Sequence, residues 1–424
     1  MKLLSLPYGN SFLPCEVPDS AAIITSHIDN ITPDAPGSSL VQQALAHPIG
    51  SRPLHELAEG VRDAVIIISD HTRPVPSKDI LPAMLRELRL GNPDIDVTLL
   101  VATGCHRLTT KEELRAKLGD KIFREEKIRI HDCDAPDSVS VGVLPSGAPL
   151  VIDSAAANAG LLVAEGFIEP HFFAGFSGGR KSVLPGVCAR KTVLGNHCSR
   201  FIHSEFARTG ILDHNPIHTD MEAAGRMAKL RFIVNVVIDS DHRTAAAFAG
   251  DFIEAHRAGC EYLKRMCLVS PIPGDIVVTT NGGAPMDQNI YQCVKCMTAA
   301  EASAKKGAVI IVCARCADGI GGKDFYRDLA ECESPAALYD RIMSTSQEDT
   351  LPDQWQSQVL ARVLMKHKVI FVTDLANKDA IEAMKMTYAP DFPAALRMAQ
   401  AEKGENASVT VIPNGIGVIV GQED

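Results

Sequence analysis

The sequence has no apolar run of about eighteen residues, the length a helix needs to cross a bilayer, so we expect no membrane-spanning segment. It also has no excess of basic residues: 42 Lys and Arg stand against 52 Asp and Glu, and the formal net charge is −10. A protein that binds the phosphate backbone of nucleic acid needs a basic face, so this balance argues against a nucleic-acid partner. The N-terminus lacks the apolar core of a secretory signal, because Pro7 and Gly9 interrupt it early.

A disulfide framework is not expected either, although the chain contains 12 cysteines. Such frameworks are typical of short secreted chains, and this chain has 424 residues and no secretory signature. We therefore expect reduced thiols and a cytoplasmic location. Hydrophobic residues make up 46% and charged residues 22% of the sequence, as in ordinary globular proteins. The length allows two or three domains with buried cores.

Short apolar runs alternate with helix-like segments in the first two thirds of the chain. Helical spacing of apolar residues predicts a helix from about Ser77, and Thr110 with Glu113 has the pattern of a capping box at the start of another helix. Residues 1–60 are turn-rich and are expected to cover an edge of the first domain. Continuous apolar runs predict buried strands at residues 64–68, 97–102, 161–164 and 232–238.

A Pro- and Gly-containing break at residues 270–274 predicts a linker between domains. After it, a helix is predicted from Tyr291 to Lys305, and strands at 275–280, 308–312, 369–372, 409–412 and 417–420. The sequence therefore predicts an α/β fold: two α/β domains with parallel-rich sheets and an active-site cleft between them. We expect residues 1–270 to form the N-terminal domain and 271–406 the C-terminal domain, with the tail 407–424 packing back on the former.

Three strands of the first domain end in polar loops. The loop after residue 68 contains Asp70, Thr72 and Arg73, the loop after residue 102 contains His106, and the loop after the third strand contains His171. Ligands of open α/β sheets bind at the carboxyl ends of the strands, so we expect these loops to converge on one cleft. The alternative for the first loop is a helix cap and a solvated charge. Most other histidines, such as His131, His242 and His256, are expected to be ordinary surface or helix residues.

The stretch with the most candidate functional residues runs from Glu165 to Asn196. Gly175, Gly178 and Gly179 have no side chains, so main-chain N–H groups there can approach a ligand closely. Arg180 and Lys181 follow at once, and glycines beside positive charge suit an anion such as a phosphate. Histidines flank the stretch, His171 before it and His197 after it. The alternative is a surface loop in which Gly, Ser and charged residues cluster by chance.

Residues 175–182 also resemble a P-loop, but Arg180 stands where the second glycine should be. The preceding strand is predicted to end about ten residues earlier, too far for a strand–loop–helix cradle. An ATPase therefore remains only a minor alternative.

Two Cys-x-x-Cys pairs have the spacing of a zinc site. One pair falls inside a predicted helix and the first cysteine of the other ends a predicted strand, so neither lies on a Gly- or Pro-rich knuckle. Buried cysteine commonly acts as a small hydrophobe. We favour buried thiols over a zinc site for Cys293, Cys296, Cys313 and Cys316.

Taken together, these segments resemble the nickel-dependent lactate racemase family. The similarity extends over essentially the whole chain, and the loop after His171 is its most specific part. The matching segments are residues 69–74, 103–107, 165–169, 171–185, 196–197, 281–283, 287–292 and 352–355.

The resemblance implies a nickel-pincer nucleotide cofactor, a pyridinium-3,5-bisthiocarboxylic acid mononucleotide that holds nickel and is made by biosynthesis proteins acting as transient partners. It implies that Lys181 carries this cofactor covalently, that His197 completes the nickel coordination, and that His106 and His171 form the acid–base pair. It further implies that the cofactor lies along Asp70, Thr72, Arg73, Ser177, Gly178 and Gly179. The residues that it implies at the substrate are Tyr291, Gln292, Lys295 and Arg73.

These residue types suit the chemistry. The Cα–H of a 2-hydroxy acid is too weak an acid for ordinary general-base removal, whereas hydride transfer to an electrophilic ring avoids the carbanion if a base takes the hydroxyl proton. The resulting keto acid is planar, so hydride can return to either face when a base serves each hydroxyl position. We therefore predict a racemase or epimerase that inverts C2 of a 2-hydroxy acid, and lactate is the substrate we favour. The alternative is a non-catalytic nucleotide- or metal-binding protein, or a P-loop-like ATPase.

Overall fold

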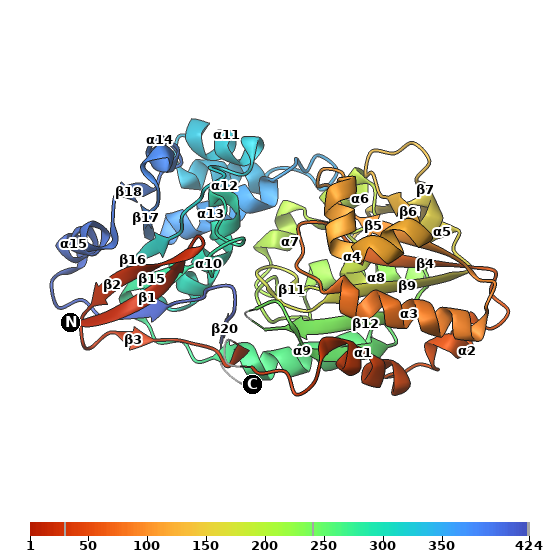
Figure 1. Ribbon diagram of the computed structural model, residues 1–424. Coiled ribbons are helices and arrows are strands. Elements are labelled where there is room, and N and C mark those ends of the chain that lie inside the picture. Colours follow the sequence, from red (N-terminus) through yellow and green to blue (C-terminus); the bar gives the residue numbers. More distant parts are fainter. Residues whose placement is uncertain (29–30, 240, 422–424) are drawn as a thin grey trace. The chain divides into compact units, whose positions relative to one another are not determined.

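The computed structural model describes residues 1–28, 31–239 and 241–421 (Figure 1). Its contacts divide the chain into two compact units. The N-terminal unit comprises Ile28–His197 and Ser204–Met266. The C-terminal unit comprises Met1–His27, Cys198–His203 and Cys267–Asp424. Each unit has a six-stranded sheet with helices beside it, so the predicted class of two α/β domains is confirmed.

The sheet of the N-terminal unit has the order β13-β12-β9-β4-β5-β6. All neighbouring strands are parallel except β12 and β13, which are antiparallel. The inner strands are continuous apolar runs because both of their faces are covered. The four predicted strands are present, and the bounds are β4 (Asp63–Ser69), β5 (Asp96–Ala102), β6 (Lys127–Ile130), β9 (Leu161–Phe167), β12 (Leu230–Ile238) and β13 (Thr244–Gly250).

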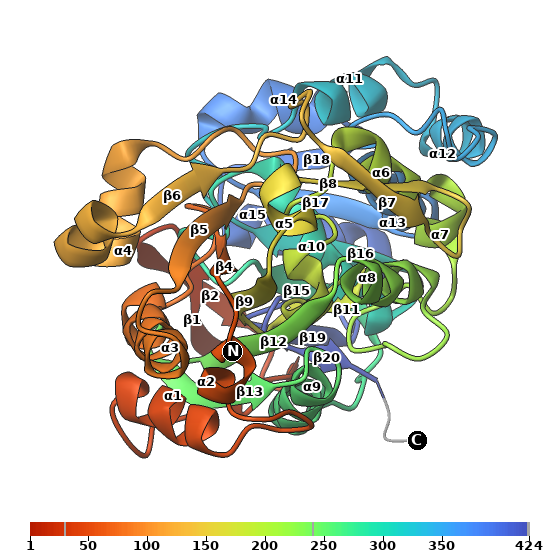
Figure 2. The ribbon, with the colours of Figure 1, turned by 90° about the vertical axis from the view of Figure 1, so that its right-hand side faces the viewer.

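Helices cover both faces of this sheet, as the side view shows (Figure 2). On one face, α1 (Gly37–Ala46), α2 (Leu54–Ala58), α3 (Ser77–Gly91) and α4 (Lys111–Glu125) share a core with the strands. The predicted capping box opens α4: Thr110 accepts from the N–H of Glu113 at 3.2 Å, and Glu113 accepts from the N–H of Thr110 at 2.8 Å. On the other side, α8 (Pro216–Met227) contacts β12 and the short 3-10 helix η2 (Gly179–Ser182).

The strand order reverses between β4 and β9. The chain runs from β4 to β5 and β6 in one direction, and β9 and β12 lie on the other side of β4. Connections leave β4 and β9 toward opposite sides, so the carboxyl ends of these two strands flank a topological switch point, where open α/β sheets bind their ligands. The loops with Asp70 and His171 begin at this point, and the loop with His106 follows the adjacent strand β5.

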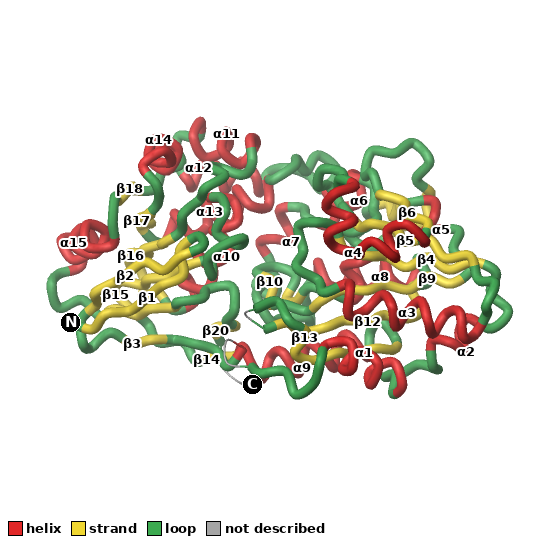
Figure 3. Tube along the Cα trace, in the orientation of Figure 1, coloured by secondary structure: helices red, strands yellow, loops and turns green. Residues whose placement is uncertain are grey.

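The sheet of the C-terminal unit is entirely parallel, with the order β18-β17-β16-β15-β19-β3 (Figure 3). One of its faces packs on the hairpin β1 (Lys2–Tyr8) with β2 (Ser11–Val17) and on α15 (Phe392–Lys403). Elsewhere α10 (Ile290–Ala302) and α13 (Gln354–Lys366) contact β15 and β16. The strand bounds are β3 (Ala22–Ile23), β15 (Gly274–Thr280), β16 (Ala304–Cys313), β17 (Lys368–Val372), β18 (Thr387–Ala389) and β19 (Val409–Ile412).

Both ends of the chain differ from the sequence-based boundaries. Strand β19 lies between β15 and β3 in the C-terminal sheet, and the tail is grouped with the C-terminal unit and not with the N-terminal unit. The first 27 residues belong to the same unit, through β3 and the β1–β2 hairpin. Helix α10 ends at Ala302, because β16 already begins at Ala304. Residues 422–424 of the predicted tail lie outside the described residues, and no described helix is long and apolar enough to cross a membrane.

Candidate active site

Asp70 and His106 form a hydrogen-bonded pair at the carboxyl ends of β4 and β5. The Nδ1 of His106 lies 2.8 Å from the Oδ2 of Asp70. The carboxylate is buried, with 2% of its side chain exposed, whereas 47% of the His106 side chain is exposed. A carboxylate accepts only, so Nδ1 carries the proton, and the neutral ring has its lone pair on the outward Nε2. This is the orientation that a general base needs.

The first loop also holds the Asp70 carboxylate ionised. Thr72 donates to Oδ1 from its hydroxyl at 2.7 Å and from its backbone N–H at 3.1 Å. Arg73 Nη1 in turn donates to the Thr72 hydroxyl at 3.1 Å. Burial by itself would raise the pKa of Asp70, but the hydrogen bonds from His106 and Thr72 and the charge of Arg73 outweigh burial and lower it to about 2.

Three other predicted site residues gather around the ring of Phe173. The ring of His171 meets it edge-on with centroids 4.5 Å apart, and the ring of His197 does so at 5.2 Å. The Nζ of Lys181 lies 5.8 Å from the centre of the same ring, within the range of a cation–π contact. Phe173 was not singled out in the sequence, since nothing distinguishes it there from its neighbour Phe172.

His171 has the opposite tautomer from His106. Its Nδ1 accepts a hydrogen bond from the backbone N–H of Ala174 at 3.2 Å. The neutral ring therefore carries its proton on Nε2 and donates hydrogen bonds from there. One imidazole thus presents an acceptor nitrogen and the other a donor nitrogen.

His197 is suited to bind a metal ion. It is buried, and its Nδ1 donates to the carbonyl oxygen of Val193 at 3.0 Å, which puts the lone pair on Nε2. Burial, and then the charge of Lys181, lower the pKa of His197 to about 3, so the ring is neutral at physiological pH. A neutral imidazole whose other nitrogen is fixed by a carbonyl is a common ligand of nickel and related metals.

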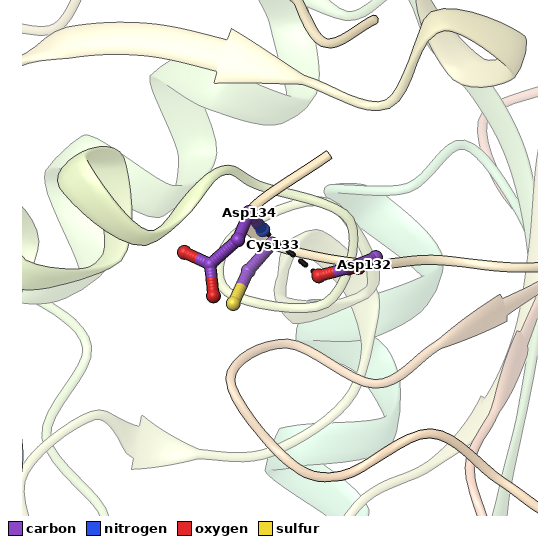
Figure 4. Close-up of side chains that lie close together, drawn as sticks. All are labelled: Asp132, Cys133 and Asp134. Atoms are coloured by element: carbon purple, nitrogen blue, oxygen red, sulfur yellow. Dashed lines mark hydrogen bonds between the residues drawn. The ribbon is translucent and has the colours of Figure 1, made fainter. Parts of the chain in front are cut away.

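The side chains that cluster closely enough to hold a metal ion by themselves lie elsewhere. Among the described residues, three potential ligand atoms come within 4.8 Å of one another only at Asp132, Cys133 and Asp134 (Figure 4). Arg190 already engages both carboxylate oxygens of Asp134, at 2.8 and 2.6 Å, which gives this group a structural role. A metal at His197 would therefore need its remaining ligands from a cofactor.

Backbone contacts connect the His106 loop with the segment that carries Lys181. The N–H of Gly104 donates to the carbonyl of Gly186 at 2.9 Å, and the N–H of Gly186 donates to the carbonyl of Lys181 at 3.1 Å. The His106 loop and the Lys181 segment therefore lie side by side in the N-terminal unit, and the convergence of the three loops on one cleft stays a prediction.

The glycine-rich segment does not have the predicted anion-cradle geometry. The N–H of Ser177 donates to the Glu169 carbonyl at 2.9 Å, and the N–H of Gly179 donates to Asn235 Oδ1 at 2.6 Å. Arg180, expected beside Lys181 as a phosphate-directed charge, is instead 1% exposed and turned into the protein. The helix that follows directly, η2, has four residues, so the strand–loop–helix cradle of a P-loop is absent from this segment.

The predicted substrate residues occupy the first turns of α10. Asn289 caps this helix by accepting from the N–H of Gln292 at 2.9 Å. The Tyr291 ring meets Phe325 edge-on at 5.3 Å, and Lys295 follows one turn after Tyr291. The Oε1 of Gln292 is buried and has no hydrogen-bond partner among the described residues. A buried acceptor of this kind is costly, which makes Gln292 a good candidate to bind a ligand.

Comparison with known proteins identifies the family of this chain. Residues 8–210 match the family description "Lactate racemase N-terminal domain", and residues 269–420 match "Lactate racemase C-terminal domain". The chain belongs to the lactate racemase family. The resemblance found in the sequence is thereby confirmed.

Individual relatives of the lactate racemase family cover the whole chain. The lactate racemases of Thermoanaerobacterium thermosaccharolyticum and Lactiplantibacillus plantarum are each 48% identical over 423 residues, which is 99% of this chain and at least 99% of theirs. The lactate racemase apoprotein structure from the former organism has a TM-score of 0.96 and covers 99% of this chain and all of that one. A Thermotoga maritima protein with a TM-score of 0.66 and 19% identity covers 89% of this chain and 97% of that one, and shares the fold.

The four cysteines with zinc-like spacing are buried thiols in this family member. The Sγ atoms of Cys293 and Cys316 are 3.9 Å apart, Cys296 donates to the Cys293 carbonyl at 3.0 Å, and Cys313 lies in the core with Cys15. Burial raises the pKa of Cys293 and Cys296, which disfavours the thiolate that zinc requires. That they bind no zinc stays a prediction.

The residues that sequence reasoning missed are the partners of Arg180. His256, expected to be an ordinary helix residue, is 2% exposed and lies 3.0 Å from Arg180 Nη1. His218 and Asn235 are also buried against this segment. They lie more than thirty residues from it along the chain, so no local pattern connects them to it. The arginine that directly follows two glycines was the one available signal.

Proposed function

We propose that this protein racemises lactate by inverting the C2 centre of the 2-hydroxy acid, with His106 and His171 as the acid–base pair. Membership of the lactate racemase family over the full chain supports the reaction. The observation that carries the assignment of residues is the opposite tautomers of the two imidazoles, fixed by Asp70 and by the N–H of Ala174. The protein is accordingly an isomerase.

The two histidines have complementary tasks in each direction. The Nε2 of His106 takes the hydroxyl proton of one enantiomer, and the buried Asp70 carboxylate stabilises the imidazolium that forms. His171 can give its Nε2 proton only as the imidazolium, because loss of that proton from the neutral ring would leave an imidazolate. It therefore takes up a second proton at Nδ1 from solvent and donates its Nε2 proton to the oxygen when the other enantiomer forms, which leaves its ring neutral. His106 is then the imidazolium and His171 the neutral ring, so the two residues exchange roles in the reverse direction.

The N-terminal unit fits the nickel-pincer nucleotide that the family resemblance implies. His197 offers a neutral nitrogen as the single protein ligand of the metal. Lys181 and His197 both contact the ring of Phe173, so we propose that Lys181 anchors the cofactor whose metal His197 binds. When bound, this group supplies the electrophile that accepts the C2 hydride and returns it. We propose that the cofactor also lies along Asp70, Thr72 and Arg73. It would meet Ser177, Gly178 and Gly179 without hydrogen bonds from the N–H groups of Ser177 and Gly179, which are already paired.

The substrate residues proposed in the C-terminal unit are Tyr291, Gln292 and Lys295, together with Arg73 of the N-terminal unit. A cation such as Lys295 suits the substrate carboxylate, and the unpaired Gln292 oxygen suits its hydroxyl. Holding the planar keto acid by its carboxylate lets the ketone turn without leaving. Proteins that build the cofactor are expected as transient partners, and the cytoplasm as the location.

Single-histidine variants test this proposal. Holoprotein made together with the cofactor-biosynthesis proteins should convert either pure lactate enantiomer to the racemate. His106→Ala and His171→Ala should each lose on the order of 10²–10⁴-fold in kcat while bound nickel and the fold persist. His47→Ala, an exposed histidine of the same unit, serves as the control. Turnover near that of the control in either variant would refute the acid–base assignment, and failure to racemise lactate would favour a binding protein.

The anchor is tested separately by mass. Intact-mass analysis of holoprotein should show an adduct that maps to the Lys181 peptide. The adduct should be absent in Lys181→Arg, because a guanidinium remains protonated and is a poor nucleophile. Active holoprotein with the mass of the bare chain would rule out a covalent link and leave His197 as the holding residue.

A further inference from the structure

Arg180 is a buried cation whose hydrogen bonds all stay within the N-terminal unit. Its Nη2 donates to the carbonyl of Ala174 at 2.8 Å, and its Nη1 donates to the carbonyls of Phe176 at 2.9 Å and Gly178 at 3.2 Å. Burial lowers the pKa of Arg180 to about 10, so the side chain remains charged at neutral pH. A desolvated charge is costly, and this set of carbonyls helps to offset the cost.

Two neutral histidines complete the surroundings of the guanidinium. His218 Nδ1 accepts from Arg180 Nε at 3.0 Å. His256 Nε2 lies 2.8 Å from the carbonyl of Ser177 and therefore donates to it, which fits with the two Nη1 protons going to Phe176 and Gly178. Burial and the charge of Arg180 lower the pKa of both rings, to about 3 for His218 and well below the usual value for His256.

The glycines make this arrangement sterically possible. A Cβ on Gly179 would lie 2.6 Å from Cγ of His256, and one on Gly178 would lie 2.8 Å from the carbonyl oxygen of Phe167. Their φ angles of +53° and +77° are also in the region that favours glycine. The glycines therefore allow the segment to fold closely over the histidine and the end of β9.

The segment held by Arg180 is the one that presents the predicted functional side chains. Ala174 is central: its carbonyl accepts from Arg180, and its N–H donates to His171 Nδ1. At the other end, Lys181 directly follows Arg180, and its N–H donates to the Gly178 carbonyl at 3.1 Å, the same oxygen that Arg180 Nη1 holds. One guanidinium thus holds the carbonyl of the residue whose N–H sets the tautomer of His171, and also the turn that carries Lys181.

We propose that Arg180, supported by His218 and His256, is the positioning residue of this site, and that it sets the tautomer of His171 and the placement of Lys181. It touches neither substrate nor reacting atoms and acts only through the 174–178 backbone. The proposal rests on the roles proposed above for His171 and Lys181. Its structural part, the control of the His171 tautomer, holds whatever reaction the protein catalyses.

The decisive variant is Arg180→Lys, which keeps a cation but cannot donate to three separated carbonyls. In apoprotein labelled with ¹⁵N-histidine, at about pH 8.5 where imidazoles are neutral, wild-type His171 should be in the Nε2–H form. In Arg180→Lys it should become a mixture of both tautomers, and amide exchange over 171–183 should accelerate at least tenfold. In holoprotein, the fraction of chains with an adduct at the Lys181 peptide and kcat should each fall at least tenfold, with the KM for lactate changed less.

Two controls separate positioning from general loss of stability. Leu88→Ala, in the core of the same unit, lowers the melting temperature without touching the segment and should leave the His171 tautomer unchanged. His218→Asn keeps an acceptor near the position of Nδ1, so His171 should keep its wild-type tautomer in this variant. His218→Leu removes the acceptor, so His171 should become a mixture of both tautomers. This pair decides the question if Arg180→Lys does not fold.

The positioning role would be overturned if folded Arg180→Lys showed the wild-type tautomer of His171 and wild-type amide exchange over residues 171–183. If Arg180→Lys does not fold, the same result in His218→Leu would overturn it. That result is distinguishable from failure of the proposed function, which would appear as wild-type racemisation in His106→Ala or His171→Ala with the tautomer of wild-type His171 still fixed.

Discussion

At the scale of single residues, the buried Asp70 carboxylate decides which nitrogen of His106 can accept a proton. Asp70→Asn replaces an acceptor-only group by one that can also donate, so the ring can adopt the wrong tautomer. We expect kcat for lactate racemisation to fall on the order of 10²–10⁴-fold with little change in melting temperature. Asp120→Asn on α4, where the carboxylate is exposed, is the matched control. Equal kcat in the two variants would show that His106 needs no orienting carboxylate.

The charge of Lys181 acts on His197 before any cofactor is attached. Burial is the larger cause of the low pKa of His197, and the Lys181 ammonium adds to it. In the apoprotein, Lys181→Met should therefore raise the pKa of His197 above its wild-type value of about 3, as followed by NMR titration. Lys191→Met, an exposed site on α6 (Arg190–Asn196), should not. An unchanged His197 titration in Lys181→Met would mean that solvent screens the two groups from each other.

At the scale of elements, the cap of α10 supports the residues proposed for the substrate. Asn289→Ala leaves the N–H of Gln292 without its acceptor and should cost about 1 kcal/mol of unfolding free energy. Because the same turn carries Tyr291 and Gln292, we also expect the KM for lactate to rise severalfold with a smaller change in kcat.

Ser334→Ala provides the control for this variant, since Ser334 caps α12 (Pro335–Met343) in the same unit by accepting from the N–H of Ala337 at 3.1 Å. It should lower stability similarly and leave KM unchanged. If both variants shift KM alike, the effect belongs to the stability of the unit and not to the substrate helix.

At the scale of the whole molecule, buried neutral histidines make the apoprotein sensitive to acid. In the folded chain the pKa values of His197 and His218 are about 3 and that of His256 lies well below its usual value, whereas unfolded histidines titrate near 6.5. Below about pH 6.5 the unfolded state binds more protons, so the stability present above that pH is lost as pH falls toward the folded pKa values. Each such histidine costs about 2 kcal/mol between pH 6.5 and pH 5.

Denaturant unfolding at pH 8, 6.5 and 5 measures this loss. His218→Asn, which removes one buried titrating group but keeps an acceptor for Arg180, should show a shallower pH dependence than wild type. His47→Asn removes an exposed histidine and should show the wild-type dependence. Stability that is flat from pH 8 to pH 5 would contradict the neutral assignment of the buried rings.

Several features followed from the sequence because short-range physics fixes them. Continuous β-branched runs form the buried parallel strands, a Thr–Glu spacing of three forms the cap of α4, and polar residues at strand ends mark the loops of Asp70 and His106. The sequence-based position of the tail, residues 407–424, differs from the structure. An apolar run indicates that a strand is buried, but it does not indicate which strand it pairs with.

The sequence by itself therefore determined the α/β class, the family and the residue types of the site, because hydrophobic period and residue chemistry are local properties. Tertiary structure alone decided what each side chain does. The cation next to Lys181 turned inward because His218, His256 and the carbonyls of Ala174 and Gly178 surround it. The tautomers of His106 and His171 depend on partners that the fold supplies, and desolvation, which shifts the pKa of His197, exists only once the chain is packed.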